Sequence, residues 1–431
     1  MTSAPSAAGR PRPLWHGRGL ALLAVVLVAL NLRTAVAALS PIFDRIGDDI
    51  ALGAVGIGLL GTLPPVSFAV VGLFAPALHR RFGVERVMVF SLVAILLGHL
   101  LRAASSSYPM LVLTSALTFA GMGVANVLLP PLVKKYFPDR IGLLTGLYAT
   151  VMAIGATLPP LVAVQFAEAS GWRVSVGLWA VFAVLALLPL SALLVATRRA
   201  GAPHGAPGDR PAPGTSGTEG SPGAEGSPGD VRPATVRRLF RSPIAWSLML
   251  VFALTSVNAY AMFAWLPSLL VDLAGVTDAQ SGALLSLFSV MGLPAALIVP
   301  VLAARLRNVG PLIGAGVVFY LLGYGGLLLL PSGPVWLWVA FVGLGPLLFP
   351  LSLALINLRT RTHAGSVALS SFVQSFGYGI GALGPLVVGV LHDATGGWTV
   401  PLVVLIGTAL ALTVSGIVVA RPRMLEDEWQ N

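Results

Sequence analysis

The sequence predicts an all-α membrane protein whose twelve transmembrane helices form two six-helix pseudo-repeats. Three observations support this prediction. The 431 residues are 56% hydrophobic and only 10% charged, whereas about a quarter of the residues in a soluble domain are charged. Twelve apolar runs reach the length of about 20 residues that a helix needs to cross the hydrocarbon of a bilayer. A stretch rich in Gly, Pro and Ser separates the first six runs from the last six.

The apolar runs define the expected spans. In chain order they lie near 19–43, 55–78, 85–103, 109–133, 141–166, 173–197, 243–270, 278–304, 309–331, 334–357, 366–391 and 398–420. Residues Ala35, Val36 and Ala37 resemble the cleavage site of a signal peptide. Because eleven further spans follow, we expect the first run to remain an uncleaved helix.

The segment between spans six and seven has the composition of a linker. Residues 201–230 read GAPHGAPGDRPAPGTSGTEGSPGAEGSPGD, and their only apolar side chains are alanines, which cannot anchor a core. Such a segment is expected to be disordered. The predicted domains are an N-terminal tail (1–18), an N-terminal bundle (19–197), the linker (198–242), a C-terminal bundle (243–420) and a C-terminal tail (421–431).

Lysine and arginine concentrate on one side of the predicted bilayer. Of the 26 basic residues, 22 lie in the tails, the linker and alternate loops, 3 lie in the opposite loops (Arg45, Arg102 and Arg173), and Arg33 lies within a span. Because loops rich in Lys and Arg stay in the cytoplasm, we expect both termini and the linker there, and the protein in a bacterial cytoplasmic membrane. The net charge of +10 is thus a topology signal rather than a sign of nucleic-acid binding.

The composition also narrows the chemistry. With no cysteine in the chain, disulfides, thiolate metal sites and cysteine nucleophiles are excluded. The six histidines are scattered over loops, linker and one span, so no convergent catalytic or metal-binding group is expected. No phosphate-binding loop follows a strand. We therefore expect no enzyme, no cofactor and no metal, and transport driven by a gradient of ion or substrate.

The two halves of the chain align with one another at an offset of 222–227 residues. Five matches occur in order. They are Asn31 with Asn258, Pro76 and Arg81 with Pro300 and Arg305, the GMG at 121–123 with the GLG at 343–345, Gly155 with Gly381, and Gly171-Trp172 with Gly397-Trp398. Parallel six-helix repeats joined by a cytoplasmic loop are typical of the major facilitator architecture.

Several blocks carry a closer resemblance. They are NLRTAVAALSPIF in span one, NVLLPPLVKKYFPDRIGLLTGLYATVMAIGA across spans four and five, GWRVSVGLWAV in span six and YAMFAWLPSLL in span seven. With these blocks the chain, from about residue 19 to 420, resembles the cyanate/2-nitroimidazole permease (CynX/NimT) family of the major facilitator superfamily. The resemblance implies alternating access around a mid-membrane site lined by helices one, four, seven and ten, and transport of a small polar or anionic compound.

Arg33 is the main candidate for substrate binding. It lies about 20 Å from the start of the first span, near the middle of the bilayer, where a charge costs at least about 2.5–3.5 kcal/mol. All 16 acidic residues fall in loops, the linker, the tail or span ends, so no carboxylate is expected beside it. Either Arg33 donates to carbonyls and locks helix packing, or the missing counter-charge is the substrate. We favour the second, because a planar guanidinium suits a carboxylate, nitro group or small oxyanion.

Other polar residues near mid-depth are further candidates. Cavity lining and an interhelical hydrogen bond are equally open for five of them, Asn126, Tyr148, Asn258, Tyr260 and Gln374, and Tyr260 is the repeat equivalent of Arg33. His99 is a candidate proton relay, although packing inside the third span is the favoured alternative. Asn31 lies about 200° around the helix from Arg33, so only one of the two can face a cavity.

These observations predict a secondary active transporter for a small anionic or weakly acidic solute, with Arg33 recognising the charge of the substrate. The alternative is a proton-coupled efflux pump for drugs or metabolites. The Gly-Pro motif that marks such antiporters is missing from span five, where the sequence reads GATLPP. The expected partners are the solute and the bilayer, with a co-transported proton left open. We expect a monomer that binds no nucleic acid.

Overall fold

The computed structural model describes residues 18–200 and 238–429, and the regular elements in these ranges are all helices. Twelve of the helical segments are long and apolar enough to cross a membrane, which confirms the predicted all-α fold. Most of the predicted linker, residues 201–237, lies outside the described residues, as do residues 1–17 and 430–431.

The N-terminal half consists of α1 (Gly19–Ala37), η1 (Ser40–Ile42), α2 (Phe43–Gly47), α3 (Ala54–Phe82), α4 (Val84–Ala103), α5 (Tyr108–Tyr136), α6 (Ile141–Ser170), α7 (Trp172–Gly177) and α8 (Ala180–Ala200). The first span is shorter than predicted, because α1 ends at Ala37 and a 3₁₀ turn containing Pro41 follows. A proline disfavours helical backbone at the residue before it, so the apolar run continues without the helix.

The C-terminal half consists of α10 (Pro243–Ala274), α11 (Asp278–Arg305), α12 (Gly310–Leu329), α13 (Val335–Leu344), η2 (Gly345–Leu347), α14 (Leu348–Leu358), α15 (His363–Gly381), α16 (Leu383–Thr395), α17 (Thr399–Ala420) and η3 (Leu425–Trp429). Span ten is interrupted at η2, which contains Pro346, and span eleven at Ala382, just before Pro385. Proline removes a backbone donor and clashes with the preceding turn, which explains why these two spans are broken.

The tryptophans that match between the repeats make the same bond in each half. The indole N–H of Trp172 donates to Asp49 over 2.8 Å in the N-terminal half. The indole N–H of Trp398 donates to Asp272, also over 2.8 Å, in the C-terminal half. Each bond ties the start of a sixth helix to a residue at the same end of its half, Asp49 beyond α2 and Asp272 in the last turn of α10.

The matching glycines also occupy the same position. A Cβ at Gly155 would clash with the backbone oxygen of Leu30 in α1, and a Cβ at Gly381 would lie 2.6 Å from the Cβ of Ser256 in α10. Glycine is therefore required where the fifth helix of each half crosses the first. Both glycines lie where the fifth helix of a half meets the first, so the predicted repeat is also present in the packing.

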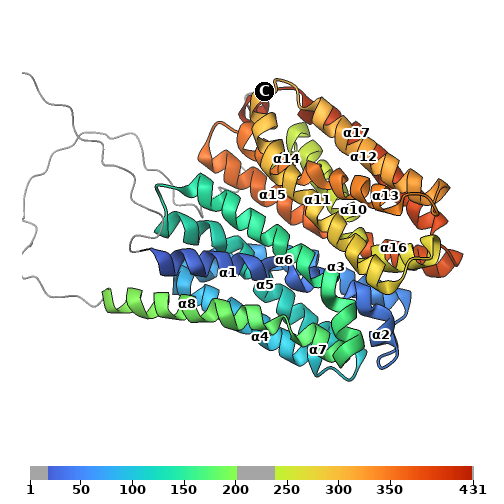
Figure 1. The fold of residues 1–431 in the computed structure, drawn as a ribbon. Coiled ribbons are helices and arrows are strands. Elements are labelled where there is room, and N and C mark those ends of the chain that lie inside the picture. Colours follow the sequence, from blue (N-terminus) through green and yellow to red (C-terminus); the bar gives the residue numbers. More distant parts are fainter. Residues whose placement is uncertain (1–17, 201–237, 430–431) are drawn as a thin grey trace, which may run out of the picture.

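The two halves are in contact at one end of the bundle. We call the end at which α8 stops and α10 begins the linker end, and the opposite end the far end; these lie to the left and right of Figure 1. At the far end Arg45 of the N-terminal half pairs with Asp278 of α11 over 3.2 Å. Nearby, Ser286 of α11 donates to the backbone oxygen of Thr157 in α6 over 2.8 Å.

Helices α3 and α16 also meet at the far end, through small residues. A Cβ at Gly61 would lie 2.7 Å from Pro385 and 2.8 Å from Ala264, and a Cβ at Gly58 would lie 2.9 Å from the backbone oxygen of Pro385. Such contacts bring the two backbones together without a gap. The far end is therefore closed by ion pairing and close helix packing.

Candidate functional site

Arg33 lies half-buried in the last turns of α1, at the boundary between the two halves. Its guanidinium carbon is 5.5 Å from the ring centroid of Phe68 in α3, a cation–π contact. Its other neighbours come from the C-terminal half, where the hydroxyls of Tyr260 and Tyr378 interact with it. Within the described part of the chain, no carboxylate forms an ion pair with Arg33. The guanidinium is thus a charge between the halves without a counter-charge.

Three aromatic side chains lie beside Arg33 and two more pack against Tyr378, and we call these five the aromatic cage. They are Phe68 of α3, Phe252 and Tyr260 of α10, Phe349 of α14 and Tyr378 of α15. Tyr378 is at the centre, with ring centroids 6.1 Å from Phe68, 5.0 Å from Phe252, 6.4 Å from Tyr260 and 6.0 Å from Phe349. Such a site can bind a flat anion in two ways, through the charge of the guanidinium and through stacking on the aromatic rings.

The direction of Arg33 follows from its neighbour Asn31. The amide of Asn31 donates to Leu27 over 2.8 Å and to Phe182 of α8 over 2.9 Å, so it faces its own half. Two residues further along a helix the side chain points about 200° away. Arg33 therefore faces the C-terminal half.

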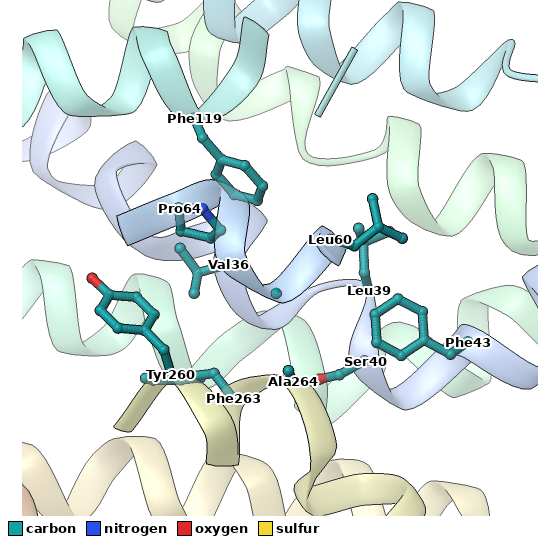
Figure 2. A pocket seen from close by; sticks show the side chains of 11 residues that line it. Val36, Leu39, Ser40, Phe43, Leu60, Pro64, Phe119, Tyr260, Phe263 and Ala264 are labelled. Atoms are coloured by element: carbon teal, nitrogen blue, oxygen red, sulfur yellow. The ribbon is translucent and has the colours of Figure 1, made fainter. Parts of the chain in front are cut away.

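A small cavity of about 20 Å³, large enough for about one water molecule, lies beside Tyr260 on the far-end side of the site. Figure 2 shows its lining, which includes Leu60 and Pro64 from α3, Phe119 from α5 and Phe263, three residues after Tyr260 in α10. The lining is mainly apolar. The site is therefore closed toward the far end by an apolar layer.

Among the described residues that the sequence predicted for the site, only Tyr260 interacts with Arg33, through its hydroxyl. Asn258 lies on another face of α10, where it is completely buried. Its amide donates to Leu254 over 2.8 Å and to Thr408 over 3.0 Å, while its oxygen accepts from Tyr324 over 2.9 Å. Asn258 thus forms the interhelical bonds that were its alternative role, and its polar atoms are not available to a ligand.

Three other candidates form no hydrogen bond or ion pair with Arg33 in the described part of the chain. Asn126 of α5 and Tyr148 of α6 are half-buried. Gln374 of α15 is half-buried one turn before Tyr378, and its amide donates to Ser370 over 2.7 Å. These residues stay proposed cavity-lining positions.

His99 does not lie at the site. It is completely buried in α4, a helix that packs against α5, α7 and α8 of its own half. Its neighbours there are Arg102 and the backbone of Val176. A relay between the site and either end would need a histidine that reaches the boundary between the halves. The placement contradicts that role and matches the packed alternative.

Sequence inspection missed most of the aromatic cage. Tyr378 occurs in the stretch SFGYGIG, whose glycines suggested packing, yet it lies one turn beyond Gln374 and on the same helix. That spacing was the available signal. For Phe68, Phe252 and Phe349 no signal existed, because phenylalanine is common in any membrane span.

Comparison with known proteins identifies the family. A sequence model of the Major Facilitator Superfamily matches residues 21–382. The chain belongs to this superfamily. Its major facilitator fold is also that of a solved bacterial homolog of the human lysosomal transporter Spinster, which covers 95% of this chain and is itself covered to 96%, with a TM-score of 0.69 and 14% identity.

Three relatives match this major facilitator protein over most of its length. The uncharacterized transporter YycB of Bacillus subtilis (strain 168) is 31% identical, with 93% of each chain covered. The 2-nitroimidazole transporter of Escherichia coli (strain K12) is 28% identical and covers 98% of this chain and 99% of its own length. The cyanate transport protein CynX of the same organism is 27% identical, with 88% and 91% covered. The resemblance to the CynX/NimT family is confirmed, and the protein is a multi-pass membrane transporter and not an enzyme.

Proposed function

We propose that this transporter moves a small anionic or weakly acidic solute, similar to cyanate or a nitro compound, through the cytoplasmic membrane by alternating access. The observation that carries the proposal is the guanidinium of Arg33, which lies between the two halves with no carboxylate partner in the described chain. A charge that is partly removed from water and has no counter-charge is costly. An anionic solute would supply the missing counter-charge.

The neighbours of Arg33 narrow the class of solute. A guanidinium offers five N–H donors in a plane, and the hydroxyls of Tyr260 and Tyr378 can donate to the same acceptor. The cage adds aromatic faces that favour flat, conjugated groups. Cyanate, nitrate, nitroimidazoles and aromatic carboxylates share these features. The compounds after which two relatives are named, 2-nitroimidazole and cyanate, also have these features.

The same geometry suggests how binding is coupled to movement. Arg33 belongs to the N-terminal half, whereas Tyr260 and Tyr378 belong to the C-terminal half. An anion held by all three would bridge the halves and favour a conformation in which the site is enclosed. The solute can drive a rearrangement only as far as it binds one state better than the other.

The source of coupling is also part of the proposal. Described acidic residues lie at helix ends and in loops, and His99 packs inside the N-terminal half. A proton that accompanies transport would therefore travel on the weakly acidic solute itself. We also propose a monomer, since each chain contains a complete site, with both termini in the cytoplasm as the distribution of basic residues predicts.

The test is ligand-induced thermal stabilisation of the purified protein with cyanate, nitrate, benzoate, 2-nitroimidazole and a cationic dye. We expect an anion or nitro compound to stabilise the wild type, Arg33→Lys to respond weakly and Arg33→Ala to respond only at concentrations well above those that stabilise the wild type. Arg33→Lys keeps the charge and loses the planar donors, so it separates charge from geometry. Stabilisation by the dye alone, equal in all three proteins, would contradict the proposal and favour drug efflux. Uptake into proteoliposomes then establishes transport of the stabilising compound.

A further inference from the structure

A second cavity, of about 340 Å³, lies between α14 and α15 toward the linker end and is open to the surface, where Leu353, Asn357 and Ser371 are exposed. Its lining consists of Leu353, Ile356 and Asn357 from α14 and Ser366, Ser370 and Ser371 from α15. None of these residues belongs to the aromatic cage. The α14 wall is apolar except for the amide of Asn357, the α15 wall carries three hydroxyls, and the lining contains no charged side chain.

The hydroxyls on this wall are not used by the helix that carries them. In membrane helices serine commonly donates to the carbonyl one turn earlier, as Ser352 does to Leu348 over 2.7 Å and Ser289 to Leu285 over 2.9 Å. Ser370 instead accepts a bond from Gln374 over 2.7 Å. Among the described residues, no acceptor is recorded for the O–H of Ser370 or Ser371. Both hydroxyls are therefore available as donors.

Asn357 contributes a third available donor. Its side-chain oxygen accepts from Ser366 over 2.7 Å, which fixes the amide at the cavity wall. No acceptor for its N–H₂ group is recorded in the described part of the chain. Three free donors that line one cavity suit a ligand rich in acceptors, such as a carboxylate, nitro group or small oxyanion.

The cavity and the Arg33 site are connected by α15. Ser366, Ser370, Gln374 and Tyr378 follow one another at intervals of four residues, so they form a polar stripe that drifts slowly around the helix. Ser370 is about 12 Å along the axis from Tyr378, at 1.5 Å per residue. In Figure 1 the labels of α14 and α15 lie on the linker-end side of the C-terminal half. The stripe thus leads from the linker end to the neighbour of Arg33.

We propose that this cavity is a second, weaker binding station for the transported solute, which holds it by hydroxyl and amide donors between Arg33 and the linker end. The inference rests on the proposed function. A solute that leaves a guanidinium directly for water loses all of its interactions at once. Donors without charge would replace part of them and still release the solute, which is the balance that multi-site conduction needs.

The absence of cysteine from the chain allows a direct test. A single Ser370→Cys substitution places one thiol in the cavity, and its reaction with a small neutral thiol reagent is followed with and without benzoate, nitrate or 2-nitroimidazole. Ser106→Cys, at an exposed loop position at the far end, serves as the control for reagent reactivity. Both substitutions are made in the wild type and in Arg33→Ala.

We expect the solute that stabilises the wild type to slow the modification of Ser370→Cys in both backgrounds, by about tenfold when its concentration is about ten times its Kd for this station. Ser106→Cys should be unaffected. Protection that disappears in Arg33→Ala would come from occupancy of the Arg33 site and would overturn the second station while the proposed function stands. If no compound stabilises the wild type or protects either thiol, the proposed function fails and this inference fails with it.

Discussion

Arg33 and Tyr260 occupy equivalent positions in the two repeats and meet across the boundary between the halves. The pseudo-symmetry that places Asn31 and Asn258 on buried faces of α1 and α10 also turns the residue two positions further toward the opposite half. A cation therefore faces a hydroxyl at the pseudo-symmetric centre. The two repeats place Arg33 and Tyr260 at equivalent positions. Because their side chains differ, the site is asymmetric.

The hydroxyl of Tyr378 should contribute to binding separately from its ring. Tyr378→Phe keeps the contacts with Phe68 and Phe252 but removes a donor beside Arg33. Because a hydrogen bond to a charged group contributes about 1.5 kcal/mol or more, we expect the Kd for the stabilising anion to rise about tenfold. Isothermal titration or ligand-induced thermal stabilisation measures the change.

A matched substitution controls for the loss of a buried hydroxyl. Tyr320 of α12 is also completely buried, and its hydroxyl has no recorded partner among the described residues. Tyr320→Phe should leave the Kd unchanged. Equal weakening by both variants would show that Tyr378 acts through packing alone.

Asn258 and Asn126 should behave in opposite ways. Asn258→Ala leaves the buried hydroxyl of Tyr324 without its acceptor, so we expect a loss of about 1–3 kcal/mol in stability. Ligand-induced stabilisation should persist, because Asn258 lies away from Arg33. Asn126→Ala removes a half-buried amide with no recorded bond in the described chain, so it should alter ligand affinity more than the unfolding temperature. Thermal unfolding with and without ligand distinguishes the two, and a reversed pattern would contradict both placements.

The sequence predicted the twelve spans and the repeat because both depend on local properties. Apolar length determines a span, and a matched Gly155 and Gly381 determine a crossing that the structure confirms. It did not predict the interruption of spans ten and eleven, since an apolar run continues through a proline break. It also could not tell Asn258 from Tyr260, because two positions on one helix differ only in the direction they face. Tyr378 was missed for a similar reason, since its role depends on a helix of the other half.

Close packing of α6 against α11 should hold the far end closed. A Cβ at Gly282 would clash with the backbone oxygen of Pro160, so Gly282→Ala should push the halves apart there. We expect the far end to open more often, by about tenfold if the substitution costs the closed state about 1.4 kcal/mol. A thiol at Ser40, now buried in the lining of the small cavity, should then react faster with a neutral reagent.

Gly292 provides the comparison for this substitution. It lies on the same helix, α11, and a Cβ there would have nothing within 4 Å. Gly292→Ala should leave the reactivity of the thiol at Ser40 unchanged. Equal reactivity in the wild type and Gly282→Ala would show that the far end tolerates the added methyl group by a local adjustment.

The C-terminal tail should stabilise the start of α15 in a pH-dependent way. The carboxylate of Glu426 accepts from the backbone N–H groups of Arg361 and Thr362 over 3.0 and 3.1 Å, and from the hydroxyl of Thr362 over 3.0 Å. Partial burial disfavours its charged form, but these hydrogen bonds outweigh burial and hold the pKa of Glu426 below its ordinary value of 4.5. A pKa lowered by folding means that the stabilisation is complete above the ordinary value and is lost as the pH falls through the folded value.

Glu426→Gln should therefore loosen the tail and the α14–α15 connection at neutral pH, while wild type and variant should converge as the pH falls through the folded pKa of Glu426, which lies below 4.5. Amide hydrogen exchange of residues 359–366 measures this. Asp427→Asn is the control, because Asp427 pairs with Arg361 on the exposed surface, where an ion pair contributes about 0–1 kcal/mol.

Since α15 carries Ser370, Gln374 and Tyr378, loosening its first turn should also reduce the protection of the Ser370→Cys thiol by solute. Unchanged exchange in Glu426→Gln at neutral pH would show that the tail contacts the bundle without stabilising the start of α15.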